Sequence, residues 1–331
     1  MASALASVDE LPASVGISDG LTRLLAGKEP EPADLVALLA SDLGLAIGAL
    51  RLAGSHTPGG REIPSLESAV DRLEPTRLLA MVAATGSFDP LAASDDTEPL
   101  ILRIRSHAAA TRAAAIELCR AGGFEAVEEA ATTALIHDVG HLVIRRLHPE
   151  HDPGGDRTTR TPQERQRAER ERYGIDHALV GGVLARRWDL PDRIAVAIER
   201  HHNENATGLA ALVAAADQVA HYRAGDAVSI PQLVCLAGEN GVGHDELRRI
   251  LNGTPPVIDP QVVWASEPCP LSEREMDTLV GLGQGRVYKQ IAEDLGISVS
   301  TIRTHLHNVY RKLEVIDRAQ AVIKAREMGW L

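Results

Sequence analysis

Cysteine is scarce in this chain of 331 residues, which has only Cys119, Cys235 and Cys269, all widely separated. No CxxC pair is present, so a disulfide framework is not expected. The first residues lack a basic segment followed by an apolar core, so they do not have the pattern of a signal peptide. These absences predict a protein of the reducing cytoplasm.

Aromatic residues and long apolar runs are also missing. Aromatics make up 3% of the chain, and no stretch approaches the ~20 apolar residues of a membrane span, so no membrane association is expected. The apolar fraction is nevertheless 44%, and cores must be built from Leu, Ala, Val and Ile. Ala and Leu with many Arg and Glu favour helices. No strand pattern and no repeat is visible, so we expect an all-α fold.

The length and the apolar spacing predict two domains joined by a linker. Helical spacing indicates a body over residues 1–225, with its core at about 99–222. Residues 226–268 have fewer apolar residues and several Gly and Pro, so we expect a linker with one helix, at about 243–252. A separate module follows at 269–331.

Charge is distributed unevenly between these parts. The chain has a net charge of −12. Residues 270–331 contain 9 Lys and Arg and 8 Asp and Glu, a net of +1, which leaves −13 on the remainder. A near-neutral module beside an acidic body fits a DNA reader whose body is kept away from phosphates, although solubility of the body explains the acidic excess equally well.

The C-terminal module has the pattern of short helices separated by tight turns. Ser272 and Glu275 form a capping-box pair. Gly296 permits a turn, and Ser298 can cap the helix that follows, over residues 299–313. Apolar residues recur in that helix at spacings of four, three and four, at Ile302, Leu306, Val309 and Leu313.

The polar face of that helix is the candidate DNA-binding surface. Its residues are Ser300, Thr301, Arg303, Thr304, His305, Asn308, Arg311 and Lys312. Hydroxyl, amide and guanidinium groups suit both phosphates and base edges. The alternative is a small helical bundle with a solvated polar face. A last helix, at about 317–328, has small residues for packing or dimerisation, at Ala319, Ala321, Val322 and Ala325.

Residues 271–331 resemble the LuxR-type helix-turn-helix. The matching segments are Leu271-Ser-Glu-Arg-Glu, Ile291-Ala-Glu-Asp-Leu-Gly-Ile-Ser, Thr301-Ile-Arg-Thr-His, Lys312-Leu, Arg318 and Ala321. The resemblance implies a four-helix module that binds double-stranded DNA as a homodimer, with 299–313 as its recognition helix. Val287 stands where the family often has Ser or Thr, so the preceding scaffold helix is expected to lack that cap.

The body contains a scattered set of histidines and aspartates on predicted helices. They are His107, His137, Asp138, His177, His201, His202 and Asp217. An adjacent His and Asp can bind one metal, or the Asp can bridge two. His107 and Asp217 would close a first site with the His137-Asp138 pair, and the remaining histidines would form a second. Imidazole with carboxylate suits Fe, Mn, Ni or Zn better than Mg. Thirteen histidines also give accidental pairs, so a metal-free polar core is the alternative.

Residues from about 20 to 222 resemble an HDOD domain, a relative of the HD phosphohydrolases. The segments are Asp42-Leu-Gly-Leu, Leu50-Arg-Leu-Ala-Gly-Ser, Ile63-Pro-Ser-Leu-Glu-Ser-Ala-Val, His137-Asp-Val-Gly-His, Tyr173-Gly-Ile-Asp-His-Ala-Leu-Val-Gly, Leu184-Ala-Arg-Arg-Trp-Asp-Leu-Pro and Ala197-Ile-Glu-Arg-His-His. The resemblance implies an output or signalling domain, often missing part of the catalytic set. Here every usual HD ligand type has a candidate. No Gly-Tyr-Pro follows His202, which argues against cyclic-di-GMP cleavage.

These features together predict a cytoplasmic transcriptional regulator. An HDOD-like domain that binds a nucleotide or protein signalling partner would control the LuxR-type module. The alternative is a metal-dependent HD-type phosphohydrolase or phosphodiesterase tethered to DNA, with phosphate held by Arg103 or by Arg145-Arg146. The Arg145-Arg146 pair also fits a simple helix C-terminal charge pair. A scaffold that recruits other regulators is a third possibility.

Overall fold

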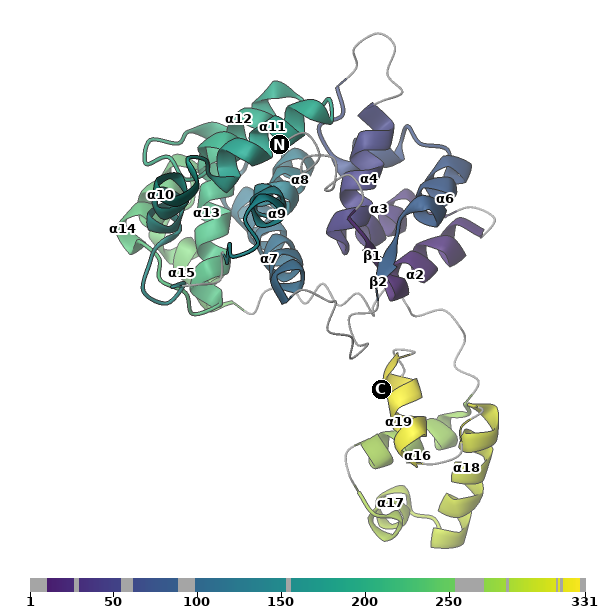
Figure 1. Cartoon of the computed structure of the whole chain (residues 1–331). Coiled ribbons are helices and arrows are strands. Elements are labelled where there is room, and N and C mark those ends of the chain that lie inside the picture. Colours follow the sequence, from purple (N-terminus) through teal and green to yellow (C-terminus); the bar gives the residue numbers. More distant parts are fainter. Residues whose placement is uncertain are drawn as a thin grey trace. The chain divides into compact units, whose positions relative to one another are not determined.

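The computed structural model describes residues 11–26, 30–54, 62–88, 99–152, 156–253, 271–283, 286–313, 315 and 318–327. The chain divides into two compact units, Met1–Ile258 and Asp259–Leu331 (Figure 1). Both are helical, which confirms the predicted all-α class. A two-residue parallel pairing of β1 (Ala13–Ser14) with β2 (Ser87–Phe88) is a small addition to it.

The first part of the larger unit is a small helical bundle. Its helices are α2 (Val15–Ala26), α3 (Pro32–Ala40), α4 (Leu43–Gly54), α5 (Leu66–Val70) and α6 (Pro75–Ala84). Leucines fill its centre, and Leu21, Leu39 and Leu50 have no exposed surface. The backbone N–H of Leu66 donates to Thr132 Oγ1 at 3.0 Å, which joins the bundle to the helices that follow.

Asp42 fixes the bundle against the long helix α7 (Pro99–Gly122). Its carboxylate accepts hydrogen bonds from the backbone N–H groups of Ser14 and Gly44 at 2.9 and 2.8 Å. It also pairs with the guanidinium group of Arg105 on α7. These contacts fix the helix that carries His107.

The second part of the larger unit continues from α7. Its helices are α8 (Val127–Ile136), α9 (Gly140–Leu147), α10 (Pro162–Tyr173), α11 (His177–Arg187), α12 (Asp192–Arg200), α13 (Gly208–Arg223), α14 (Ile230–Glu239) and α15 (His244–Asn252) (Figure 1). α13 is rich in alanine and buried on all sides, so α7, α8, α12 and α14 pack closely around it. Close packing of this kind brings side chains from several helices to one point.

The chain turns at His137–Val139, between α8 and α9. One expectation about this unit needs correction. A linker with one helix was expected over 226–268, but α14 and α15 both lie there. Leu233 and Ile250 are buried in the same apolar cluster as α7 and α13. The larger unit therefore extends through Gly253, and residues 254–268 lie outside the described residues.

The smaller unit consists of α16 (Glu273–Gly283), α17 (Tyr288–Leu295), α18 (Val299–Lys312) and α19 (Arg318–Glu327). The expected buried face of α18 is confirmed, because Ile302, Leu306, Val309 and Leu313 are all at most 3% exposed. The capping expectations are also confirmed. Ser272 and Glu275 bond to each other's backbone N–H, and Ser298 accepts from Thr301 N–H at 3.1 Å.

No helix among the described residues is both long and apolar enough to cross a membrane.

The two cysteines in the described residues are expected to differ in reactivity. Cys119 is buried in α7, and burial raises the pKa of its thiol to about 11, whereas Cys235 is exposed on α14. Only the thiolate attacks a disulfide reagent, and at pH 8 roughly one Cys119 in a thousand is ionised. In a Cys269→Ser variant, one thiol per chain should react rapidly at pH 8 and the second only after denaturation. Two rapid thiols would contradict the burial of Cys119.

Candidate metal centre and DNA-binding surface

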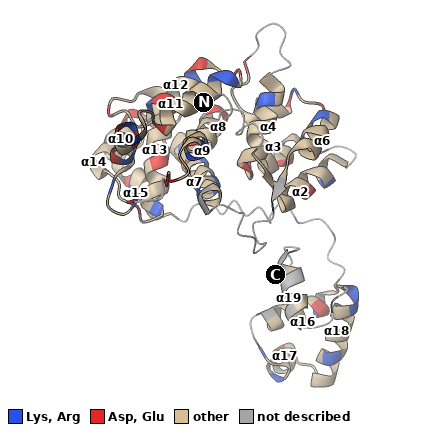
Figure 2. Cartoon of the chain, viewed as in Figure 1, with Lys and Arg blue, Asp and Glu red and all other residues tan. Residues whose placement is uncertain are grey.

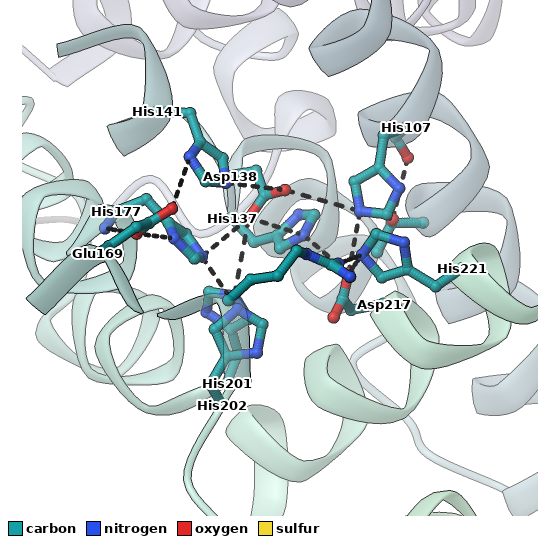
Figure 3. A network of polar contacts seen from close by, with 12 residues as sticks. His107, His137, Asp138, His141, Glu169, His177, His201, His202, Asp217 and His221 are labelled. Carbon is teal, nitrogen blue, oxygen red and sulfur yellow. Dashed lines mark hydrogen bonds and ion pairs between the residues drawn. The ribbon is translucent and has the colours of Figure 1, made fainter. Parts of the chain in front are cut away.

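The seven predicted ligands converge in the larger unit (Figure 3). His107 comes from α7, Asp217 from α13 and His177 from the first position of α11. The other four, which were expected within helices, instead lie where helices end. His137 and Asp138 follow α8, and His201 and His202 follow α12. Residues at a helix end can turn into the protein interior, so two adjacent side chains reach one centre.

Two close helix contacts bring these segments together. A Cβ on Gly140 would lie 1.9 Å from the carbonyl oxygen of His177, and one on Gly181 would lie 2.8 Å from Ile198. Only glycine permits such an approach, because any side chain would overlap a neighbouring atom. The glycines therefore hold α9 against α11, and α11 against α12, and they place His177 beside Asp138.

Asp138 is the centre of the arrangement. Its Oδ1 lies 3.3 Å from His137 Nε2, 3.4 Å from His177 Nε2 and 3.7 Å from His201 Nε2. Its Oδ2 lies 3.6 Å from His107 Nε2. The expected division into two sites is therefore only approximate. Asp138 forms one possible metal-binding group with His177, His201 and His202, and it also faces His107, which belongs to the group with His137 and Asp217.

Asp217 is the second carboxylate. Its Oδ1 lies 2.9 Å from His107 Nε2 and 3.5 Å from His137 Nε2. The same oxygen is 3.2 Å from Nε2 of His221, one turn further along α13. Its other oxygen is buried without a hydrogen-bond partner among the described residues. A buried carboxylate oxygen without a donor is costly unless a cation is present.

The histidines are oriented as metal ligands require. His137 Nδ1 donates to the carbonyl of Ala134 at 2.8 Å, and His201 Nδ1 donates to that of Ile198 at 2.6 Å. The proton is therefore on Nδ1, and the Nε2 lone pair points inward. Both Nε2 atoms are buried and lack a hydrogen-bond partner in the described part of the chain. These orphaned atoms fit a transition metal, which would use the lone pairs.

The protonation states of His107, His201 and Asp138 suit metal binding, whereas His177 must first lose a proton. Burial lowers the pKa of His107 and of His201 to about 4, so both imidazoles are neutral at pH 7. Burial also opposes a charge on His177, but the Glu169 and Asp138 carboxylates raise its pKa to about 9. Burial would raise the pKa of Asp138, but the surrounding imidazoles hold it well below its usual range. Neutral imidazoles and ionised carboxylates are the forms that bind metal.

Several residues of the centre were not anticipated from the sequence: His141, His151, Glu169, His221, Arg157 and Arg165. Glu169 on α10 accepts from His177 Nδ1 at 2.7 Å and fixes that ring. His221 is four residues from Asp217, and His141 is four from His137, so helical spacing alone points to both. Glu169 and the two arginines had no such signal, because α10 and the segment before it reach the site only in the folded chain.

Arginines line the same pocket as Asp138 and Asp217. They are Arg103, Arg157 and Arg165. Arg165 Nη2 lies 2.9 Å from His221 Nε2. Arg103 forms an ion pair with Asp152 at 2.7 Å. Arg145, the other arginine considered for holding a phosphate, does not line this pocket. Arg145 donates instead to the carbonyls of Pro149 and His151, which holds the segment after α9.

The candidate DNA surface lies on α18, which has no Asp or Glu (Figure 2). Five of its predicted residues are exposed: Ser300, Arg303, Thr304, Arg311 and Lys312. The other three, Thr301, His305 and Asn308, are half-buried. Lys312 also forms an ion pair with the buried Glu275 at 2.7 Å, so it joins α18 to α16 within the module.

Two further expectations about the module can be compared with the structure. Val287 has no side-chain oxygen to cap α17, as expected, but its backbone N–H donates to Gln290 Oε1 at 3.0 Å, which is the reciprocal half of a capping box. Ala321 and Ala325 on α19 have no exposed surface and pack against Leu279 and Val309. These two alanines therefore serve packing inside the module, which was one of the two roles considered for this helix.

The geometry defines a helical HD-like domain followed by a helix-turn-helix. A family model described as HDOD domain matches residues 11–204, which is more than half of the chain, and the chain belongs to this family. A second model, described as bacterial regulatory proteins, luxR family, matches residues 269–325. The C-terminal unit is therefore a LuxR-type DNA-binding helix-turn-helix domain.

Individual proteins are similar to either part. DesR, a transcriptional regulatory protein of Bacillus subtilis (strain 168), is 33% identical over 86 residues, 25% of this chain and 43% of DesR. An uncharacterized protein of Treponema pallidum (strain Nichols) is 25% identical over 202 residues, 59% of this chain and 38% of that protein. The chain thus spans less than half the length of these relatives.

A solved structure is similar to the larger part of the chain. It is the MmoQ response regulator from Methylococcus capsulatus str. Bath, with a TM-score of 0.53 and 21% identity over 74% of this chain and 99% of that one. At this identity the likeness concerns the fold alone.

Proposed function

We propose that this protein is a cytoplasmic transcriptional regulator whose HDOD domain controls DNA binding by its LuxR-type domain. The observation that carries the proposal is the polar face of α18. Buried Ile302, Leu306 and Val309 fix the helix in its module, while Arg303, Thr304 and Arg311 remain exposed on the other side. A rigid helix with exposed guanidinium and hydroxyl groups is what recognition in a major groove needs.

The eight residues of the predicted surface then take two roles. The exposed arginines and hydroxyls contact phosphates and base edges, and the half-buried Thr301, His305 and Asn308 lie at the margin of the contact. The domain acts as a homodimer, because two recognition helices must reach half-sites about one helical turn, ~34 Å, apart. The HDOD domain sets this dimer geometry in response to a nucleotide or protein partner. DesR carries the name of a transcriptional regulatory protein, which supports a role in transcription for this chain.

The HDOD domain holds one or two metal ions of the Fe, Mn, Ni or Zn type. Asp138 with His177, His201 and His202 forms one ligand set, and His107, His137 and Asp217 form the other. A bound metal of this kind lowers the pKa of a water ligand and can polarise a phosphoryl oxygen. The chain itself orients the ligands. Glu169 fixes the ring of His177, and the backbone carbonyls of Ala134 and Ile198 fix those of His137 and His201. The surrounding helices exclude water.

One observation favours hydrolysis as a second candidate function. Arg103, Arg157 and Arg165 line the same pocket as the ligands. Guanidinium groups beside a metal centre suit the phosphate of a phosphoester. A regulator without turnover would use the same groups to hold a phosphorylated ligand, so the two functions differ in turnover and not in binding.

The regulator is tested by Arg303→Ala. Binding of a ~30-base-pair duplex of random sequence is measured by fluorescence anisotropy across a series of salt concentrations. Removing one phosphate contact should weaken binding by about fivefold to tenfold and reduce the salt slope by about one. A contact to a base edge would instead leave this slope nearly unchanged and relax sequence preference.

Arg248→Ala is the matched control. Arg248 is an exposed arginine on α15, and among the described residues its ion-pair partner is Asp245, at 3.8 Å. Its removal subtracts the same charge from the chain but none from α18, so binding should be close to that of the unaltered protein. Equal binding by the Arg303→Ala and Arg248→Ala variants at every salt concentration would refute the assignment of α18.

A further inference from the structure

A second group of metal-ligating side chains lies beyond His177, away from Asp217. His141 comes from α9, Glu169 from α10 and His151 from the segment between them. All three are buried. Figure 3 shows His141 and Glu169 facing each other beside His177. Glu169 uses Oε2 to orient His177, so its Oε1 is left to face the two other histidines.

The three facing atoms have the spacing of a zinc coordination sphere. His141 Nδ1 and His151 Nε2 are 3.0 Å apart. Glu169 Oε1 is 3.4 Å from the first nitrogen and 3.8 Å from the second. Tetrahedral Zn²⁺ with bonds of about 2.0–2.1 Å places its ligand atoms about 3.3–3.4 Å from one another. The observed distances lie on both sides of that value, so small movements suffice to bind the ion.

No pattern of protons on neutral rings satisfies these contacts. If His141 Nδ1 carries the proton and donates to His151, then its Nε2 lone pair faces Asp138 Oδ2 at 3.8 Å. If His151 donates instead, the Nδ1 lone pair of His141 faces Glu169 Oε1 at 3.4 Å. Either arrangement sets two acceptors against each other in a buried place. A cation removes the conflict, because both nitrogens and the carboxylate oxygen then bind it and His141 Nε2–H faces Asp138.

His177 is not available as the third ligand. Its Nδ1 is bonded to Glu169 at 2.7 Å, and its Nε2 lies 2.9 Å from His202 Nε2.

We propose that His141, His151 and Glu169 form a zinc site separate from the Asp138 centre, with a fourth position open to water or a small ligand. Two imidazoles and one carboxylate are a donor set that binds Zn²⁺ well. The ion ties the segment after α9 to α9 and α10. Arg145 already supports that segment through the carbonyl of His151, at 3.2 Å. Glu169 binds the ion through Oε1 and holds His177 through Oε2. Binding of zinc therefore affects the position of His177 beside Asp138.

The site is tested by counting zinc in the full-length protein. The chain is stripped with a chelator, incubated with Zn²⁺ alone, passed through a desalting column and analysed for zinc per chain. His151→Gln should hold one equivalent fewer than the unaltered protein. His148→Gln is the matched control, because His148 lies in the same segment but faces Glu150 and the ring of Tyr173, and it should hold the full number.

A second variant separates ligation from a structural role of His151. In His151→Cys a thiolate replaces the imidazole, so the zinc number should be restored. With Co²⁺ in place of zinc, a thiolate-to-cobalt absorption band should appear. An unchanged zinc number in His151→Gln, or the absence of that band in His151→Cys, overturns the proposal. Neither result bears on DNA binding, so failure here is distinct from failure of the proposed regulator.

Discussion

Replacing Asp138 with asparagine should weaken manganese binding to the HDOD domain by at least about 100-fold, since it removes a direct ligand and not only an orienting partner. The carboxylate faces Nε2 atoms of His137, His177, His201 and His107 within 3.7 Å. Asparagine keeps the shape but loses the charge, and its NH₂ group cannot bind a metal. The remaining histidines would then have to hold the cation without the carboxylate they share.

Manganese is the suitable probe, because free Mn²⁺ is measured directly by electron paramagnetic resonance during a titration of the chelator-treated chain. Asp19→Asn is the matched control. Asp19 is exposed on α2, and the same change of charge there should leave the binding curve unaltered. Equal affinity in the Asp138→Asn and Asp19→Asn variants would show that the cation binds elsewhere.

The same protein preparations separate the two candidate functions. A model phosphodiester is added to the Mn²⁺- or Fe²⁺-loaded chain. Turnover that is present in the unaltered protein and lost in Asp138→Asn favours the tethered hydrolase. Metal binding without turnover, together with DNA binding that changes with metal, favours the regulator in which the centre is a sensor.

The fold class was accessible from the sequence because it depends on local patterns. Helical apolar spacing and the absence of a strand pattern are visible residue by residue. The apolar face of α18 and the caps at Ser272 and Ser298 were predicted from spacing alone, and all are present. Each of these features involves residues within four positions of one another.

The metal centre was only partly accessible, because its details depend on contacts between distant segments. The sequence identified the ligand types and the His137-Asp138 pair, but not that this pair lies in a turn between α8 and α9. Glu169 was missed because its partner, His177, follows a helix end and a tight turn at Gly174, where spacing gives no guidance. The sharing of Asp138 between two ligand groups follows only from how α7, α11 and α12 meet.

The end of the larger unit was misjudged for a different reason. Gly and Pro suggested a linker over 226–268, yet Pro231 lies in the first turn of α14, where proline is tolerated. Gly241, at a φ of 73°, makes the turn before α15. The same residues that often mark a linker here mark the ends of two packed helices, and only the burial of Leu233 and Leu247 distinguishes the two cases.

A very tight helix contact leads to the second large expected effect, which concerns Gly140. Gly140→Ala should lower the free energy of unfolding by about 3 kcal/mol or more, at the upper end of the range for overpacked sites. The added methyl group would lie 1.9 Å from a backbone oxygen, that of His177, and backbone cannot rotate away as a side chain can. α11 must shift, and its first residue must then move away from Asp138.

Gly238→Ala is the matched control for this substitution. Gly238 also lies in a helix, but a Cβ there meets nothing within 4 Å, so alanine should be neutral or stabilise by up to about 1 kcal/mol. Urea unfolding can be followed by the fluorescence of buried Trp188 after Trp264 and Trp330 are replaced by Phe. If Gly140→Ala unfolds at the same urea concentration as Gly238→Ala, α9 and α11 are not in close contact. The same protein should then bind Mn²⁺ normally, whereas a displaced His177 predicts weaker binding together with the loss of stability.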